Sequence, residues 1–168
     1  GVANDETAKF LNTALVNNPL LAQPPNGPGL AVRYEPGKEF GAGIGIQSPN
    51  NSGSTIAEKV YAIFEIDYHT HLLYAREGNY RFWGRIGRDA DDLDQKSWGV
   101  GISLDQQISS KITAFARAGI GRTEDEGRNA HALSTGLEVV APFKSLIKDR
   151  AGLAFSRQIG VDGSESIG

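Results

Sequence analysis

From residue 29 onward, apolar and polar side chains alternate along the chain with a period of two. The first run places Leu30, Val32 and Tyr34 on one face and Arg33 and Glu35 on the other. Such alternation is typical of β-strands that have one apolar face. Further runs of the same kind have their apolar positions within 40–46, 60–68, 80–86, 98–104, 112–120, 133–139 and 151–155. With no helical pattern between the runs, the sequence predicts an all-β fold of antiparallel up-and-down strands, about eight in number.

The first 28 residues follow a different pattern. Asn4 or Asp5 can cap a short helix, and Phe10 and Leu11 belong to its apolar stripe. A proline-rich stretch at 19–29 follows, and it cannot form a strand ladder. We therefore expect an extracellular-loop segment with one short helix at 1–28, followed by the strands of a single, incomplete domain at 29–168.

The lengths of the runs and of their connections favour a membrane barrel. The runs hold roughly ten residues, as a tilted strand that crosses a bilayer requires, whereas soluble strands centre on about five or six. Compact turns are expected at 36–38, 106–110 and 142–148, and longer polar loops at 48–55, 89–95, 123–129 and from 161 onward. Short turns on one edge and long loops on the other are typical of outer-membrane barrels. The connection at 70–78 is longer than this alternation predicts.

The polar face is rich in Gly, Ser and Arg, which are too small or too polar to form a second packed core. A wide barrel would turn this face toward a water-filled lumen, whereas a sandwich would leave it in bulk solvent. Two alternatives remain: a small closed outer-membrane barrel with a structural or adhesion role, and a soluble β-sandwich that acts as a binding module.

Composition excludes several other classes. No apolar stretch approaches the ~18 residues of a spanning helix. The formal net charge of −3 argues against nucleic acid as a partner. The chain has no cysteine, so a disulfide framework, a thiolate metal site and a thiol nucleophile are all excluded.

Several patches resemble the carbohydrate-selective porins, the OprB-like family. One is at 2–19, where the chain has VANDET, FLN and VNNP. A second is GNYRFWG at 78–84, and a third is GVGISLDQQ at 99–107, followed by FARAG at 115–119. The patches keep their order over nearly the whole chain.

This resemblance implies a sixteen-stranded barrel of which the chain is the middle portion. It implies passive diffusion of small sugars, or of other small solutes or ions, across the bacterial outer membrane. The expected partners are outer-membrane lipid and the solute itself, with a homo-trimer as one possible assembly. No cofactor is expected, and the protein is not expected to be an enzyme.

A sugar pore needs charged hydrogen-bonding groups and aromatic faces at its constriction. Arg81, Trp83 and Arg85 place two guanidinium groups and an indole on the polar face of one run, and arginine supplies several fixed donors. Glu65 and Asp67, on the neighbouring run, are placed to pair with those arginines. The predicted polar wall continues through Arg33, Arg117 and Glu138. The alternative is that all of these form cross-strand ion pairs that line a wide lumen without touching solute.

Other candidate chemistry is weaker. Asp89, Asp91, Asp92 and Asp94 form a carboxylate cluster that could bind calcium, but it lacks the glycine of a helix-loop-helix site, and a solvated external loop is favoured. The glycines at 41, 43 and 45 lack the context of a phosphate loop and are interpreted as small residues on the inner face of a strand.

The histidines and the aromatic residues add little further chemistry. His69 and His71 have no evident third metal ligand, and no serine motif accompanies the pair of Asp67 and His69. Near the ends of the apolar stripes, aromatic residues suit the girdles at membrane interfaces: Tyr34, Tyr68, Tyr80 and Trp98.

Overall fold

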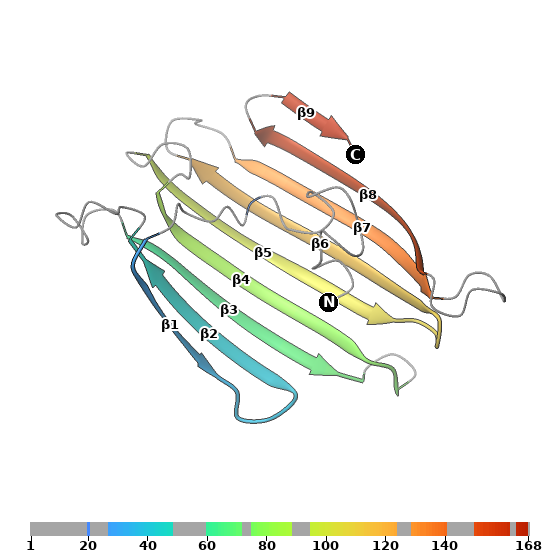
Figure 1. The fold of residues 1–168 in the computed structure, drawn as a ribbon. Coiled ribbons are helices and arrows are strands. Elements are labelled where there is room, and N and C mark those ends of the chain that lie inside the picture. The colour runs from blue at the N-terminus through green and yellow to red at the C-terminus, as the bar shows by residue number, and fades with distance from the viewer. Residues whose placement is uncertain are drawn as a thin grey trace.

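The computed structural model describes residue 20 and residues 27–48, 60–71, 75–88, 95–123, 129–140, 150–161 and 164–167. These residues form one antiparallel sheet of nine strands, in which each strand pairs with the next one along the chain (Figure 1). The strands are β1 Gly29–Tyr34, β2 Phe40–Gln47, β3 Tyr61–Thr70, β4 Gly78–Arg88, β5 Lys96–Gln107, β6 Ile112–Thr123, β7 Ala130–Val140, β8 Arg150–Val161 and β9 Ser164–Ile167. The prediction of an all-β, up-and-down antiparallel fold is confirmed. Within the described residues the sheet is not closed, because β1 and β9 are its two edges.

The predicted helix within 1–28 lies outside the described residues. None of the described residues belongs to an α-helix, and so none of them forms a helix long and apolar enough to cross a membrane.

The C-terminal end differs from the prediction. A loop was expected from residue 161 onward, but Ser164–Ile167 forms β9 and pairs with β8, with an irregular register between Gln158 and Val161. The reason is that the free edge of β8 offers a row of backbone donors and acceptors to any adjacent segment. Apolar alternation cannot identify so short and polar a strand.

The predicted contrast between short turns and long loops holds only in part. Connections 35–39 and 108–111 are compact, as expected, and connection 71–77 lies on the same edge of the sheet. Connection 141–149 also lies on this edge, yet it is longer than connections 89–95 and 124–129 on the opposite edge. The edge that carries 35–39, 71–77, 108–111 and 141–149 is called the turn edge below.

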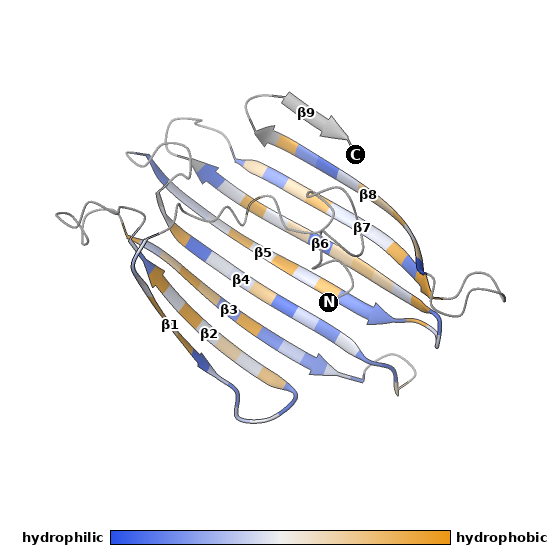
Figure 2. Ribbon diagram, viewed as in Figure 1, coloured by the Kyte–Doolittle hydropathy of each residue, from blue (hydrophilic) through white to orange (hydrophobic). Residues whose placement is uncertain are grey.

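One face of the sheet is apolar and exposed. The register places Ile44 opposite Phe64, Ile66 opposite Phe82, and Phe82 opposite Ile102, so that apolar rows cross the strands. Figure 2 shows the resulting alternation of hydrophobic and hydrophilic positions along each strand. Large apolar side chains exposed on this face are Leu30, Val32, Tyr34, Phe40, Ile44, Ile46, Phe64, Ile66, Tyr68, Phe82, Ile86, Trp98, Ile102, Leu133, Leu137, Leu153, Phe155 and Ile159. This surface is far more extensive than the apolar patches of ordinary soluble monomers.

The opposite, polar face holds most of the buried residues. Asp67 is 0%, Trp83 1% and Phe115 2% exposed. Leu20, which precedes β1 in the chain, is buried with Trp83, Ala130 and Ala132. Other buried members of this face are Arg85, Ser97, Asp105, Arg117, Ser134, Glu138 and Ser156. The usual arrangement of a protein in water, with apolar side chains inside and charges outside, is therefore inverted.

Glycines on the polar face make room for its large side chains, and Gly101 is the clearest case. Gly101 pairs with Trp83 in the ladder between β4 and β5. A Cβ atom at Gly101 would lie 2.5 Å from Trp83 Cζ2 and 2.7 Å from the Ala118 carbonyl oxygen. The indole can lie flat across β5 only because residue 101 has no side chain.

We expect Gly101→Ala to lower the free energy of unfolding by about 1–3 kcal/mol, because either the indole or the backbone must shift. The measurement is urea unfolding of the full-length protein in lipid vesicles. Gly43→Ala is the matched control, since the nearest atom to its added Cβ is 3.7 Å away, and it should change stability by no more than ~0.5 kcal/mol. Equal losses in both variants would contradict the packing of Trp83 against Gly101.

Candidate functional site

The candidate site is a cluster of charged side chains on the polar face, formed by Arg33 of β1, Glu65 and Asp67 of β3, and Arg81 of β4. Asp67 lies at its centre. Its Oδ2 accepts from Arg33 Nη2 at 2.8 Å, and its Oδ1 accepts from Arg81 Nε at 2.7 Å. Glu65 accepts from Arg33 Nη1 at 3.2 Å, and its second oxygen lies 3.3 Å from Arg81 Nε. Two guanidinium groups thus hold two carboxylates in a fixed arrangement.

Arg33 crosses two glycines of β2 to reach these carboxylates. β2 separates β1 from β3, and Gly43 lies between Arg33 and Glu65 in the cross-strand register. A Cβ atom at Gly41 would lie only 3.0 Å from Arg33 Nη2. Both glycines lie on the polar face of the sheet, and the missing side chain of Gly41 leaves room for Arg33 to form ion pairs across the intervening strand.

The two arginines differ in the donors that they keep available. Arg33 donates Nε to Glu35 at 2.6 Å and both Nη groups to Glu65 and Asp67, so each of its nitrogens is engaged by a carboxylate. Arg81 donates through Nε to Asp67, and among the described residues its Nη groups have no hydrogen-bond partner. The Arg81 side chain is 30% exposed. Arg81 is thus the member of the cluster that keeps donors available for a further acceptor.

Trp83 and Arg85 are buried next to this cluster. Arg85 donates Nε to the Leu20 carbonyl oxygen at 2.7 Å and Nη1 to Ser97 Oγ at 2.8 Å. Trp83 is 1% exposed, with Leu20 among its buried neighbours. In this arrangement the indole is covered, and the Arg85 guanidinium is engaged by Leu20 and Ser97. The prediction that both residues line a constriction stays a prediction.

Arg117 and Glu138 lie farther along the sheet and do not join the cluster. Arg117 is 3% exposed, and its Cζ atom lies 5.3 Å from the ring centroid of Phe115, in cation–π geometry. Glu138 accepts from Arg150 Nη1 at 2.7 Å. Of the eight residues predicted for the polar wall, the structure brings together Arg33, Glu65, Asp67 and Arg81, and it spreads the other four over β4, β6 and β7.

Three contributors were not among the predicted site residues: Glu35, Leu20 and Phe115. The alternation did place Glu35 on the polar face with Arg33, and Phe115, two residues before Arg117, has its side chain on the same face as that arginine. Leu20 had no such pattern, since it precedes the first strand in a proline-rich stretch.

The calcium candidates Asp89, Asp91, Asp92 and Asp94 lie outside the described residues. Among the residues that the structure does describe, no group of three or more potential metal ligands comes together.

Comparisons with known proteins leave the family open. No protein-family model matches the chain. No solved structure matches it either. A curated protein of Aquifex aeolicus, described as "Uncharacterized protein", is 33% identical over 72 residues, which is 43% of this chain. The chain covers 23% of the length of that relative.

Proposed function

We propose that this chain forms part of the wall of a bacterial outer-membrane porin, through which small hydrophilic solutes, sugars first among them, diffuse passively. One observation carries the proposal: the sheet exposes its large apolar side chains on one face and buries its charged side chains on the other. Exposed apolar surface costs about 25 cal/mol per Å² in water. Contact with lipid on that face removes this cost, and a lumen on the other face accommodates the charges.

Strand length supports a membrane-spanning sheet. β3 to β8 contain between 10 and 12 residues, which matches the roughly 9–11 residues of a tilted transmembrane strand. Tyr34 ends β1 and Tyr68 lies near the end of β3, both toward the turn edge, while Trp98 lies near the opposite edge at the start of β5. Aromatic side chains at both ends of the apolar band suit the two membrane interfaces.

The chemistry of the polar face suits a solute rich in hydroxyl groups. A sugar hydroxyl both donates and accepts hydrogen bonds, and the cluster around Asp67 presents guanidinium donors beside carboxylate acceptors. Passive transport needs no further machinery. The soluble-sandwich alternative requires a second sheet packed on the apolar face, and the described residues form a single sheet.

The test is single-channel conductance of the full-length protein in planar bilayers, with and without glucose and a disaccharide. We expect stable conductance steps that the sugars block in a concentration-dependent manner. Conductance steps that sugars do not change would support the pore but would exclude sugar as its solute. Absence of steps from protein that has demonstrably inserted into the bilayer would contradict the pore and favour a closed, structural barrel.

A further inference from the structure

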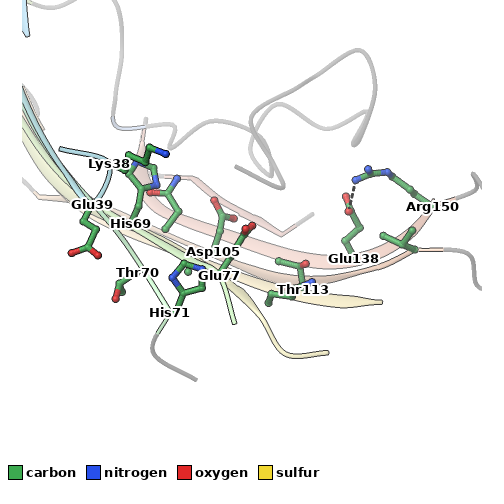
Figure 3. A pocket seen from close by; sticks show the side chains of 14 residues that line it. Lys38, Glu39, His69, Thr70, His71, Glu77, Asp105, Thr113, Glu138 and Arg150 are labelled. Carbon is green, nitrogen blue, oxygen red and sulfur yellow. Dashed lines mark hydrogen bonds and ion pairs between the residues drawn. The ribbon is translucent and has the colours of Figure 1, made fainter. Parts of the chain in front are cut away.

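A hollow lies on the turn edge of the sheet, apart from the cluster around Asp67. It has a volume of about 790 Å³, and the ends of strands β3 to β8 contribute to its lining. Figure 3 shows Asp105 along the curved sheet between His69 and the ion pair of Glu138 with Arg150. The charged side chains that line the hollow are Glu39, Glu77, Asp105 and Glu138, against Lys38 and Arg150. Carboxylates therefore outnumber cationic groups.

Asp105 is the unusual member of this lining. It is only 9% exposed, and its Oδ1 is buried without any hydrogen-bond partner. A buried carboxylate oxygen normally accepts a hydrogen bond. Leaving a buried acceptor without a donor costs about 1–3 kcal/mol, and more when the group is charged. A charge in this position needs a compensating group, and the hollow that Asp105 lines is where such a group can lie.

The charges of other buried carboxylates on the polar face are compensated by hydrogen-bonded arginines. Asp67 accepts from Arg33 and from Arg81, and Glu138 accepts from Arg150 at 2.7 Å. No such ion pair is found for Asp105 among the described residues. The nearby guanidinium of Arg117 attracts it electrostatically, but that group lies over the Phe115 ring. Arg117 therefore supplies positive charge near Asp105, but among the described residues no donor is hydrogen-bonded to Asp105 Oδ1.

Asn79 adds a second acceptor beside Asp105. The two residues are opposite each other in the ladder between β4 and β5, and both line the hollow. Asn79 Oδ1 is also buried without a partner. If the Asn79 amide turned over and donated to Asp105, the donor would be neutral and would add no positive charge beside the carboxylate.

We propose that this hollow is a binding site for small cations that carry N–H donors, such as a primary ammonium group, with Asp105 as the binding carboxylate. An ammonium offers three donors and a positive charge, and it matches two adjacent acceptor oxygens in an acidic hollow. The effect of this site on transport rests on the proposed function, because a cation site at the mouth of a pore would favour the entry of cations.

The first test compares methylammonium with tetramethylammonium, which has the same charge but no N–H donor. In channels of the full-length protein, reversal potentials should show methylammonium to be the more permeant cation. Asp105→Asn should lower the permeability of methylammonium relative to chloride on the order of fivefold, the effect of removing a unit charge about 4 Å from the passing ion. Unchanged reversal potentials in conducting channels would overturn the site and leave the porin intact.

Glu39→Gln is the matched control. It removes one carboxylate from the same hollow, but the Glu39 side chain is exposed and not buried. Its effect should be clearly smaller than that of Asp105→Asn, since exposed charges are screened by salt. An equal effect would mean that the hollow acts only through its total charge, and would overturn the specific role of Asp105.

A second measurement does not require conduction. Saturation-transfer NMR on the detergent-folded full-length protein should detect methylammonium but not tetramethylammonium, and Asp105→Asn should remove that signal. If this result is obtained with protein that forms no channels in bilayers, the cation site is supported and the proposed pore is refuted. Equal signals from the parent and from Asp105→Asn would refute the site whatever the channels do.

Discussion

Phe64→Arg is expected to make the free energy of folding of the full-length protein into lipid vesicles less favourable by about 2–4 kcal/mol. This is the cost of a cationic side chain on the lipid face near the bilayer midplane. Phe64 lies on the apolar face in the middle of β3, 43% exposed, with its ring centroid 5.6 Å from that of Phe82. The folded fraction can be followed by the mobility difference between folded and unfolded protein on semi-native gels, over a series of urea concentrations.

Two comparisons make this experiment decisive. Gln158→Arg introduces the same side chain on the polar face, since Gln158 pairs with Ala132, and it should change folding by no more than ~0.5 kcal/mol. A soluble domain predicts the opposite outcome, because an arginine at a water-exposed position is harmless. If Phe64→Arg folds normally, the apolar face does not meet lipid.

The second large effect is expected from the simultaneous replacement of Arg33 and Arg81 by Ala. Together the two arginines provide the cationic hydrogen-bond donors of Asp67, which is 0% exposed. Without them a buried carboxylate remains uncompensated, a situation that costs about 3–5 kcal/mol. Each single variant leaves one partner in place, so the double variant should lose more than the sum of the two singles. Urea unfolding in vesicles measures these free energies.

Adding Asp67→Asn to the double variant should restore part of the lost stability, because the buried charge is then gone. Lys111→Ala, at an exposed position in the turn between β5 and β6, controls for loss of positive charge and should have an effect within ~0.5 kcal/mol. Additive single effects and no rescue by Asp67→Asn would show that the cluster does not act as a unit.

Alternation along the chain was sufficient to predict the strands and their two faces. Leu30, Val32 and Tyr34 lie on the apolar face of β1 as expected, and Arg33 points to the polar face. This succeeds because the side-chain direction in a strand has a strict period of two, so each residue's face follows from its parity alone. The strand β9 was missed because its pairing depends on the free edge of β8 and not on its own pattern.

The candidate site was predictable in part for the same reason. Parity places Glu65, Asp67 and Arg81 on one face, and adjacent strands bring them into register. Parity does not give the distance between strands that are not neighbours, so the contact of Arg33 with Asp67 across the glycines of β2 required the structure. Nor could the sequence predict that Trp83 and Arg85 would be covered, because Leu20 reaches them from outside the alternating pattern.

Within the described residues, each strand pairs only with its neighbours in the chain, and this has an evolutionary consequence. Two consecutive strands form a hairpin whose ends return to the same edge, so gain or loss of one hairpin leaves every other pairing and the orientation of every other strand unchanged. The circumference of a closed sheet grows with its strand number. If the sheet closes into the proposed pore, a lineage built on this plan can change the bore in steps of two strands, by duplication or deletion of short stretches of its gene.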